Sequence, residues 1–255
     1  MHFTSIAFLL FLPIVLLTYR CLPSRRLQNL LLLSASYVFY GWWDYRFCLL
    51  MLASSLVDYY VGAVLHQTSD QRRRRQWLTL SVICNLGLLA VFKYLNFFID
   101  SVQQFGQLFG FNMTGGTLEI ILPVGISFYT FQTMSYTLDI YRKQLEPADS
   151  LVDYLAFVSF FPQLVAGPIE RASHLLPQLQ QPRKVTWEDS ATGVRQILCG
   201  FFKKIVIADS VAAFVTAGND NPAVASGSEL VIATVMFAFQ IYCDFSAYSD
   251  IAIGT

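Results

Sequence analysis

The sequence predicts an all-α protein that spans a membrane several times. Of its 255 residues, 55% are hydrophobic and only 13% are charged, whereas soluble domains contain about one quarter charged residues. The apolar residues form runs long enough to cross a bilayer as helices, and basic residues gather in the short segments between those runs.

A formal net charge of zero argues against a nucleic-acid partner. The five cysteines stand singly, so neither a disulfide framework nor a metal site is expected.

Loop charges give a consistent topology for residues 1–141. We expect five spans, over about residues 3–19, 27–43, 47–65, 77–99 and 119–141. The loops after the first, third and fifth spans are basic, and Arg72 to Arg75 form the longest cluster, so these loops are predicted to be cytoplasmic. The N-terminus is therefore expected on the opposite, periplasmic side.

The pattern changes after residue 150. The apolar run 151–166 is short and is interrupted by Pro162, and Gly167-Pro168 follows it. A break at membrane depth is tolerated only where protein or water covers the freed backbone groups. We expect a short or re-entrant helix over 151–166, followed by a polar cytoplasmic segment over 167–193.

Residues 194–215 place Arg195, Lys203 and Lys204 among apolar side chains. Lysines in the middle of a span are costly, whereas an amphipathic helix at the interface can extend them toward water. The sequence therefore favours an interfacial helix over 194–215.

The last expected span, 229–252, carries Asp244 and Asp250. A carboxylate at membrane depth costs about 2.5–3.5 kcal/mol on insertion scales, so the pair needs a protein interior or a wet cavity. Gln240, Asp244 and Tyr248 fall on one stripe of a helix. Two roles stay open for the aspartates, namely orienting a catalytic group and bonding one helix to another. Asp58, in the third span, needs a partner or a cavity for the same reason.

Several motifs in the same order resemble the membrane-bound O-acyltransferase family, in the branch that contains the alginate O-acetyltransferases. Ala247 stands where those relatives usually have glycine. The motifs are Phe92–Phe98, Leu122–Gln132, Pro162–Arg171, Leu175–Gln178, Phe202–Lys204 and Gln240–Gly254.

The resemblance implies a funnel-shaped fold of tilted helices in the bacterial inner membrane, with 1–255 as a single membrane domain. It implies transfer of acetyl groups from a cytoplasmic donor, acetyl-coenzyme A, to hydroxyls of an exported polysaccharide such as alginate, with a periplasmic acetyltransferase as partner. No cofactor is expected to stay bound. The candidate funnel-lining residues are Gln132, Gln163, Arg171, Gln240, Asp244, Tyr248, Ser249 and Asp250.

The catalytic histidines are expected outside this sequence. In the family the base lies in a Trp-His-x-Ser stretch, which is absent from these residues, so we expect a chain shortened at Thr255 and inactive by itself. His174 is interpreted as a solvated loop histidine. A transporter or polysaccharide-export channel is the main alternative, because intramembrane acids and broken helices also occur in carriers. A non-catalytic scaffold for a synthesis complex is a third possibility.

Overall fold

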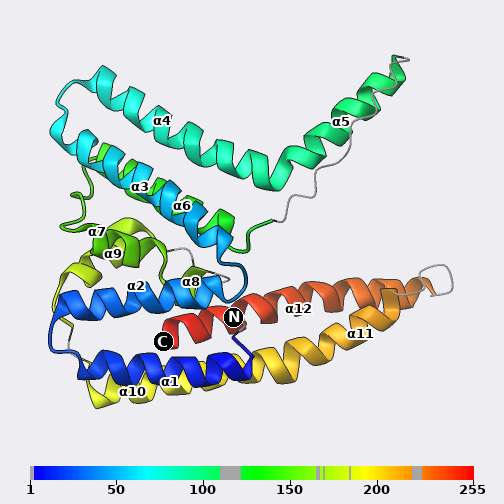
Figure 1. Ribbon diagram of the computed structural model, residues 1–255. Helices are drawn as coiled ribbons and strands as arrows, with labels where there is room; N and C mark the ends of the chain where they lie inside the picture. The colour runs from blue at the N-terminus through cyan, green and yellow to red at the C-terminus, as the bar shows by residue number, and fades with distance from the viewer. Residues whose placement is uncertain (1–2, 110–121, 165–166, 169, 184, 220–225) are drawn as a thin grey trace. The chain divides into compact units, whose positions relative to one another are not determined.

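The computed structural model describes the chain except for residues 1–2, 110–121, 165–166, 169, 184 and 220–225. The described residues form helices and no strand (Figure 1). They divide into two compact units, which are described separately. The first unit consists of Met1–Trp43, Phe160–Ile169 and Gln181–Thr255, and the second of Asp44–Ser159 and Glu170–Gln180.

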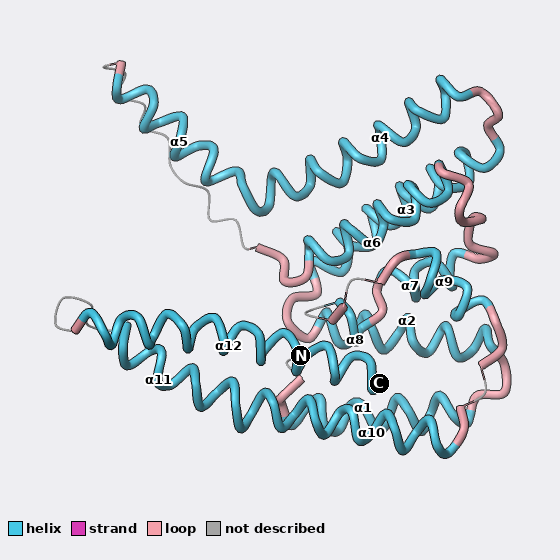
Figure 2. The backbone as a smooth tube through the Cα atoms, turned by 180° about the vertical axis from the view of Figure 1, so that it is seen from behind, coloured by secondary structure: helices cyan, strands magenta, loops and turns pink. Residues whose placement is uncertain are grey.

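The first unit is built around one long helix, α12, which packs along α10, η2 and α11 (Figures 1 and 2). The helix η2 is a π-helical segment that joins α10 to α11 without a loop. The helices of this unit are α1 (Ile6–Cys21), α2 (Arg25–Gly41), α8 (Phe161–Leu164), α10 (Trp187–Phe201), η2 (Phe202–Ala208), α11 (Asp209–Asn219) and α12 (Gly227–Gly254).

Aromatic side chains fill the core of the first unit. Phe3, Phe8, Phe39 and Phe161 are all at least 97% buried, and their rings contact one another in edge-on and stacked arrangements. Ser36 ties the short helix α8 to α2, because its hydroxyl accepts a hydrogen bond from the Phe161 N–H at 3.1 Å. The burial of four phenylalanines makes this cluster a major source of stability for the unit.

Glycines let α10 and α12 approach each other closely. A Cβ atom on Gly193 would lie 2.5 Å from the Gly254 carbonyl oxygen, and one on Gly200 would lie 2.8 Å from the Ala247 carbonyl oxygen. Real Cβ atoms do not come so near, so only glycine fits at these two positions. Small residues at a helix contact are typical of membrane bundles, in which close van der Waals packing drives association.

The second unit packs α3, α4 and α6 against one another and sets α7 and α9 beside them. A π-helical segment, η1, separates α4 from α5, and the long helix bends there (Figure 1), as π segments commonly cause helices to do. The helices are α3 (Arg46–Gln67), α4 (Gln71–Leu89), η1 (Ala90–Tyr94), α5 (Leu95–Leu108), α6 (Ile126–Tyr141), α7 (Leu151–Val158) and α9 (Ala172–Gln180).

The all-α, multi-spanning class predicted from the sequence is confirmed. Among the described residues, Arg46–Gln67, Gln71–Gln107 and Gly227–Gly254 are helices long and apolar enough to cross a membrane. The other three expected spans fall on α1, α2 and α6, and the start of the fifth lies outside the described residues. Exposed side chains such as Val91, Phe97 and Val102 suit contact with lipid. The chain is a multi-pass membrane protein.

Two segments form helices whose bounds differ from the expected ones. The run 151–166, whose last two residues are not described, forms the two short helices α7 and α8. The helix expected over 194–215 is part of a longer helical run from Trp187 to Asn219, and its placement at the membrane interface stays a prediction.

Candidate functional site

Two lysines of η2 and three aspartates form an ion-pair cluster in the first unit. Lys203 Nζ lies 2.6 Å from Asp250 Oδ2 and donates a second hydrogen bond to Ser246 Oγ at 3.0 Å. Gln196 Nε2 lies 3.5 Å from the other oxygen of Asp250. Side chains from both α10 and η2 therefore contact Asp250.

Lys204 forms ion pairs with two carboxylates. Its Nζ lies 2.6 Å from Asp209 Oδ1 and 2.8 Å from Asp244 Oδ1, the second contact being an ion pair without good hydrogen-bond geometry. The same ammonium lies 5.8 Å from the centre of the Tyr248 ring, a distance typical of cation–π contacts. Lys204 therefore joins α11 to two successive turns of α12.

The cluster accounts for charges that would be costly in isolation. Two lysines face three aspartates, so most of the charge is compensated within the pair of helices. Opposite charges in a medium of low dielectric constant attract strongly, which offsets part of the cost of removing them from water. The π-helical geometry of η2 occurs where these two lysines lie, and π segments are frequent at functional sites.

The structure brings three of the predicted site residues into this cluster, namely Asp244, Tyr248 and Asp250. Gln240 and Ser249 are half-buried on the same helix. Gln163 is buried in α8, which belongs to the same unit and packs against α12.

Two predicted residues belong to the second unit. Gln132 is a buried residue of α6, and Arg171 is exposed just before α9. A common funnel for these residues and α12 stays a prediction.

The partners of Asp244 and Asp250 were missed by sequence reasoning. Lys203 and Lys204 were interpreted as side chains that extend toward water. For the aspartates two roles were left open, orienting a catalytic group and bonding one helix to another, but no partner was named. Two costly lysines and two costly aspartates in consecutive apolar segments were the available signal, because such groups can neutralise one another.

A second polar cluster lies between α3, α4 and α6 of the second unit. Asp58 is fully buried, and its two carboxyl oxygens contact Ser81 Oγ at 2.5 Å and Asn85 Nδ2 at 2.6 Å. Thr133 Oγ1 donates to Asn85 Oδ1 at 3.1 Å, and Ser81 Oγ lies 3.2 Å from Thr137 Oγ1. The predicted partner for Asp58 therefore exists, and it consists of neutral side chains.

Arg74 donates hydrogen bonds to carbonyl groups at the C-terminal ends of two helices in the second unit. Its guanidinium donates to Leu65 O and Thr68 O at the end of α3, and to Ile140 O at 3.2 Å and Tyr141 O at 2.8 Å at the end of α6. Carbonyl groups at a helix C-terminus lack partners and carry partial negative charge, so one buried arginine satisfies both ends.

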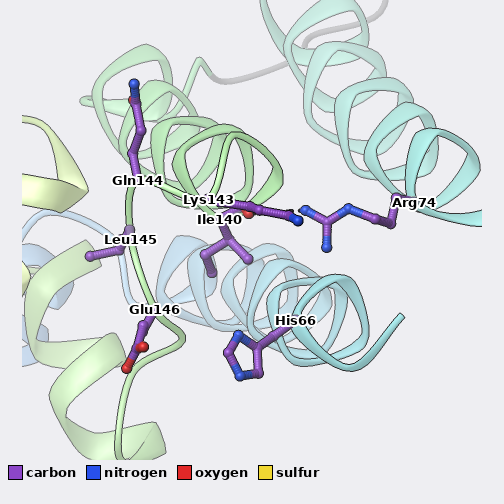
Figure 3. Close-up of a pocket in the computed structure, with 7 residues that line it drawn as sticks. All are labelled: His66, Arg74, Ile140, Lys143, Gln144, Leu145 and Glu146. Atoms are coloured by element: carbon purple, nitrogen blue, oxygen red, sulfur yellow. Dashed lines mark hydrogen bonds between the residues drawn. The ribbon is translucent and has the colours of Figure 1, made fainter. Parts of the chain in front are cut away.

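A cavity of about 310 Å³ lies beside Arg74. Arg74 and Lys143 extend toward one another in Figure 3, and Gln144 points away from them. The guanidinium of Arg74 is already bonded to carbonyl oxygens. The other charged residues that line the cavity are Lys143, which is basic, and Glu146, which is acidic. The lining residues are His66, Arg74, Ile140, Lys143, Gln144, Leu145 and Glu146.

Two of the three histidines belong to the second unit. His66 lines the cavity, and His174 is an exposed residue of α9 whose Nδ1 lies 2.6 Å from Glu170 Oε2. His2 is outside the described residues. The described residues also contain no group of three potential metal ligands.

The fold and these clusters define a multi-pass, all-α membrane protein with charged and polar groups held between its helices. Residues 142–255 match the family model of the membrane-bound O-acyltransferases. This match confirms the resemblance predicted from the motifs. The whole ion-pair cluster lies within the matched segment.

Known relatives resemble the chain over about half to all of its length. It is 40% identical to the probable alginate O-acetylase AlgI of Pseudomonas aeruginosa, over 100% of this chain and 48% of the relative. It is 34% identical to the peptidoglycan O-acetyltransferase of Helicobacter pylori, over 96% of this chain and 51% of the relative. A teichoic acid D-alanyltransferase of Bacillus subtilis is 27% identical over 53% of this chain and 35% of the relative. The chain spans about half the length of the first two relatives.

Proposed function

We propose that this chain is part of a membrane-bound O-acyltransferase of the bacterial inner membrane. The enzyme moves acetyl groups from acetyl-coenzyme A on the cytoplasmic side to hydroxyl groups of an exported polysaccharide such as alginate. The observation that carries this proposal is the match to the family domain over residues 142–255, which contains the ion-pair cluster.

The names of the relatives support the class of acceptor. They are described as acting on alginate, on peptidoglycan and on teichoic acid. Because the chain is more similar to the O-acetylases than to the D-alanyltransferase, acetyl is the favoured acyl group. A periplasmic acetyltransferase partner is part of the same proposal.

The transfer breaks the bond between the acyl carbon and the thioester sulfur and forms an ester with the acceptor oxygen. A base takes the hydroxyl proton, donors stabilise the oxyanion on the thioester carbonyl, and the sulfur leaves as a thiolate that is then protonated. Asp244, Tyr248 and Asp250 are proposed to line the path of the substrate, together with Gln240 and Ser249. Gln132, Gln163 and Arg171 are proposed to line other parts of the same funnel.

A second role is proposed for the ion-pair cluster. Lys203 and Lys204 hold the two aspartates at fixed positions on α12, so that groups lining the path need no reorganisation during the reaction. Preorganised polar groups of this kind are a principal source of rate enhancement.

Deletion of the gene tests the proposal against its alternative. The acetyl content of the exported polysaccharide should fall to background while the amount exported stays near that of the parent strain, and the intact gene should restore acetylation. A fall in export with an unchanged acetyl content per sugar would instead identify a channel or transporter.

Reporter fusions test the proposed orientation. Fusions after Trp43 and after Arg75 should report opposite sides of the membrane, the second one cytoplasmic, because the loop charges alternate. Reporters on the same side would contradict a periplasmic N-terminus.

A further inference from the structure

We propose that Asp58 is held as a neutral carboxylic acid, so that the polar cluster of α3, α4 and α6 is a binding site for one proton. The cluster lies in the second unit, and two of its three helices, α3 and α4, are long and apolar enough to span a membrane. The inference rests on the burial of Asp58, on its neutral partners and on their hydrogen bonds, and it is independent of the acyl-transfer reaction.

Three contacts of hydroxyl groups follow one another on one side of Asp58. Ser81 Oγ lies 2.5 Å from Asp58 Oδ1 and 3.2 Å from Thr137 Oγ1, and Thr137 Oγ1 lies 3.1 Å from Met134 O. Each hydroxyl group has one proton to donate. Met134 O is a carbonyl oxygen and can only accept, whereas Ser81 Oγ can accept from Thr137 or donate to it.

If Thr137 donates to Met134 O, Ser81 can donate to Thr137, and Ser81 Oγ then accepts a bond from a protonated Asp58 Oδ1. With a carboxylate at position 58, Ser81 donates to Oδ1 and Thr137 donates to Ser81, so the contact of Thr137 with Met134 O has no proton. The neutral acid therefore keeps one more hydrogen bond in a buried site, where polar groups without partners are costly.

The other side of Asp58 completes the arrangement. The amide of Asn85 donates one hydrogen to Asp58 Oδ2 at 2.6 Å and the other to Ser81 O at 3.0 Å. Its carbonyl oxygen accepts from Thr133, whose hydroxyl lies at 3.1 Å from Thr130 O as well. Because both amide hydrogens face acceptors, Oδ2 is the carbonyl oxygen of the acid and Oδ1 is the hydroxyl oxygen.

The surroundings of Asp58 supply no positive charge. No ion pair among the described residues involves it. From α4 it meets Ser81 and Asn85, and from α6 it meets the hydroxyl of Thr133. The ionisable side chains that interact with it from α6 and α7 are the phenols of Tyr136 and Tyr154. A buried group of this kind keeps its proton, because an unpaired charge in a nonpolar interior is far more costly than the neutral acid.

Infrared spectroscopy of the purified complete protein tests the site directly. At neutral pH the parent should show the carbonyl-stretching band of a protonated carboxylic acid. Asp58→Asn should remove this band, whereas the matched change Asp244→Asn should leave it in place because Asp244 is paired with a lysine. A parent spectrum without the band, or a band that survives Asp58→Asn, would overturn the proposal.

Two further variants keep the test decisive if Asp58→Asn fails to fold. Ser81→Ala removes the acceptor of the acid proton and should shift the band without abolishing it, and an unshifted band would contradict the bonding scheme.

Asp58→Leu removes every hydrogen bond of this side chain and should lower the folded yield about tenfold, equivalent to about 1.4 kcal/mol. Asp58→Asn should keep a yield near that of the parent, since an amide can donate to Ser81 and accept from Asn85. A well-folded Asp58→Leu with an unchanged yield would also count against a structured proton site.

Discussion

The two polar clusters of this protein solve the same problem in different ways. In the first unit, Asp244 and Asp250 lie 2.8 and 2.6 Å from lysine ammonium groups. In the second unit, Asp58 meets a serine hydroxyl and an asparagine amide instead. All three aspartates occur in apolar helices, so their partners, rather than their apolar surroundings, set the charge that each carries. The same Asp→Asn change should therefore remove a negative charge in the first unit and a protonated acid in the second.

Removing a lysine should break the charged cluster most severely. Lys204→Met leaves Asp209 and Asp244 without their shared cation and should cost up to about 3 kcal/mol of unfolding free energy, the lower end of the range for breaking a buried pair. The partial exposure of Asp244 keeps the effect at that end. Unfolding in mixed detergent measures it, with Lys143→Met as the control at an exposed lysine. Equal stability of the two variants would show that the cluster contributes little.

Neutralising one acid in the charged cluster should affect activity more than folding. Asp244→Asn keeps the shape of the side chain, and Lys204 retains Asp209, so the folded amount should stay close to that of the parent. Acetyl transfer should fall about tenfold or more, equivalent to about 1.4 kcal/mol of transition-state stabilisation. Polysaccharide acetylation and folded protein are measured in the same membranes. Poor accumulation with normal activity per folded molecule would indicate a purely structural role.

An exposed carboxylate outside both clusters should respond to pH. Asp189 Oδ2 accepts from the Thr186 hydroxyl at 2.6 Å and from its backbone N–H at 3.0 Å at the start of α10, and these bonds hold the pKa of Asp189 below its ordinary value. A lowered pKa means that the cap stabilises the helix above the pKa of the unfolded chain and is lost as the pH falls through the folded-state value. Amide exchange at residues 187–190 should accelerate in that acidic range, and Asp189→Ala should abolish the pH dependence. A pH dependence that persists in the variant would assign it to another group.

The smallest effect is expected at His174. This exposed histidine pairs with Glu170 in the second unit, and surface pairs contribute little. His174→Ala should therefore leave both acetyl transfer and stability within the error of measurement. A large loss of transfer with a normal fold would make His174 a catalytic base.

The sequence was sufficient to predict the helical spans but not the partners of their polar residues. Apolar runs and loop charges are local features, and they located α3, α4 and α12 correctly. Lys203 and Asp250, by contrast, are 47 residues apart, and Asp58 and Asn85 are 27 residues apart. The cost of each charge could be read from its surroundings, whereas the group that offsets it depends on how helices pack.

The run of four arginines shows the same limit. Its charge predicts a cytoplasmic loop, yet it does not indicate that Arg74 alone is 5% exposed and bonded to the ends of α3 and α6. The run was interpreted as a topology marker only. Which of four neighbouring arginines faces inward depends on the rotation of α4, which the composition of the run does not reveal.

The glycines between α10 and α12 make the charged cluster sensitive to very small changes in volume. Gly200 lies three residues before Lys203, and a Cβ there would meet Ile251 Cγ1 at 2.7 Å, one residue beyond Asp250. A single added methyl group would have to push the two helices apart, and the lysine would then no longer reach its carboxylate at 2.6 Å. The Lys203–Asp250 ion pair thus depends on the absence of a side chain at Gly200. A neutral and nonpolar substitution at this glycine can therefore weaken the ion pair as a change of charge would.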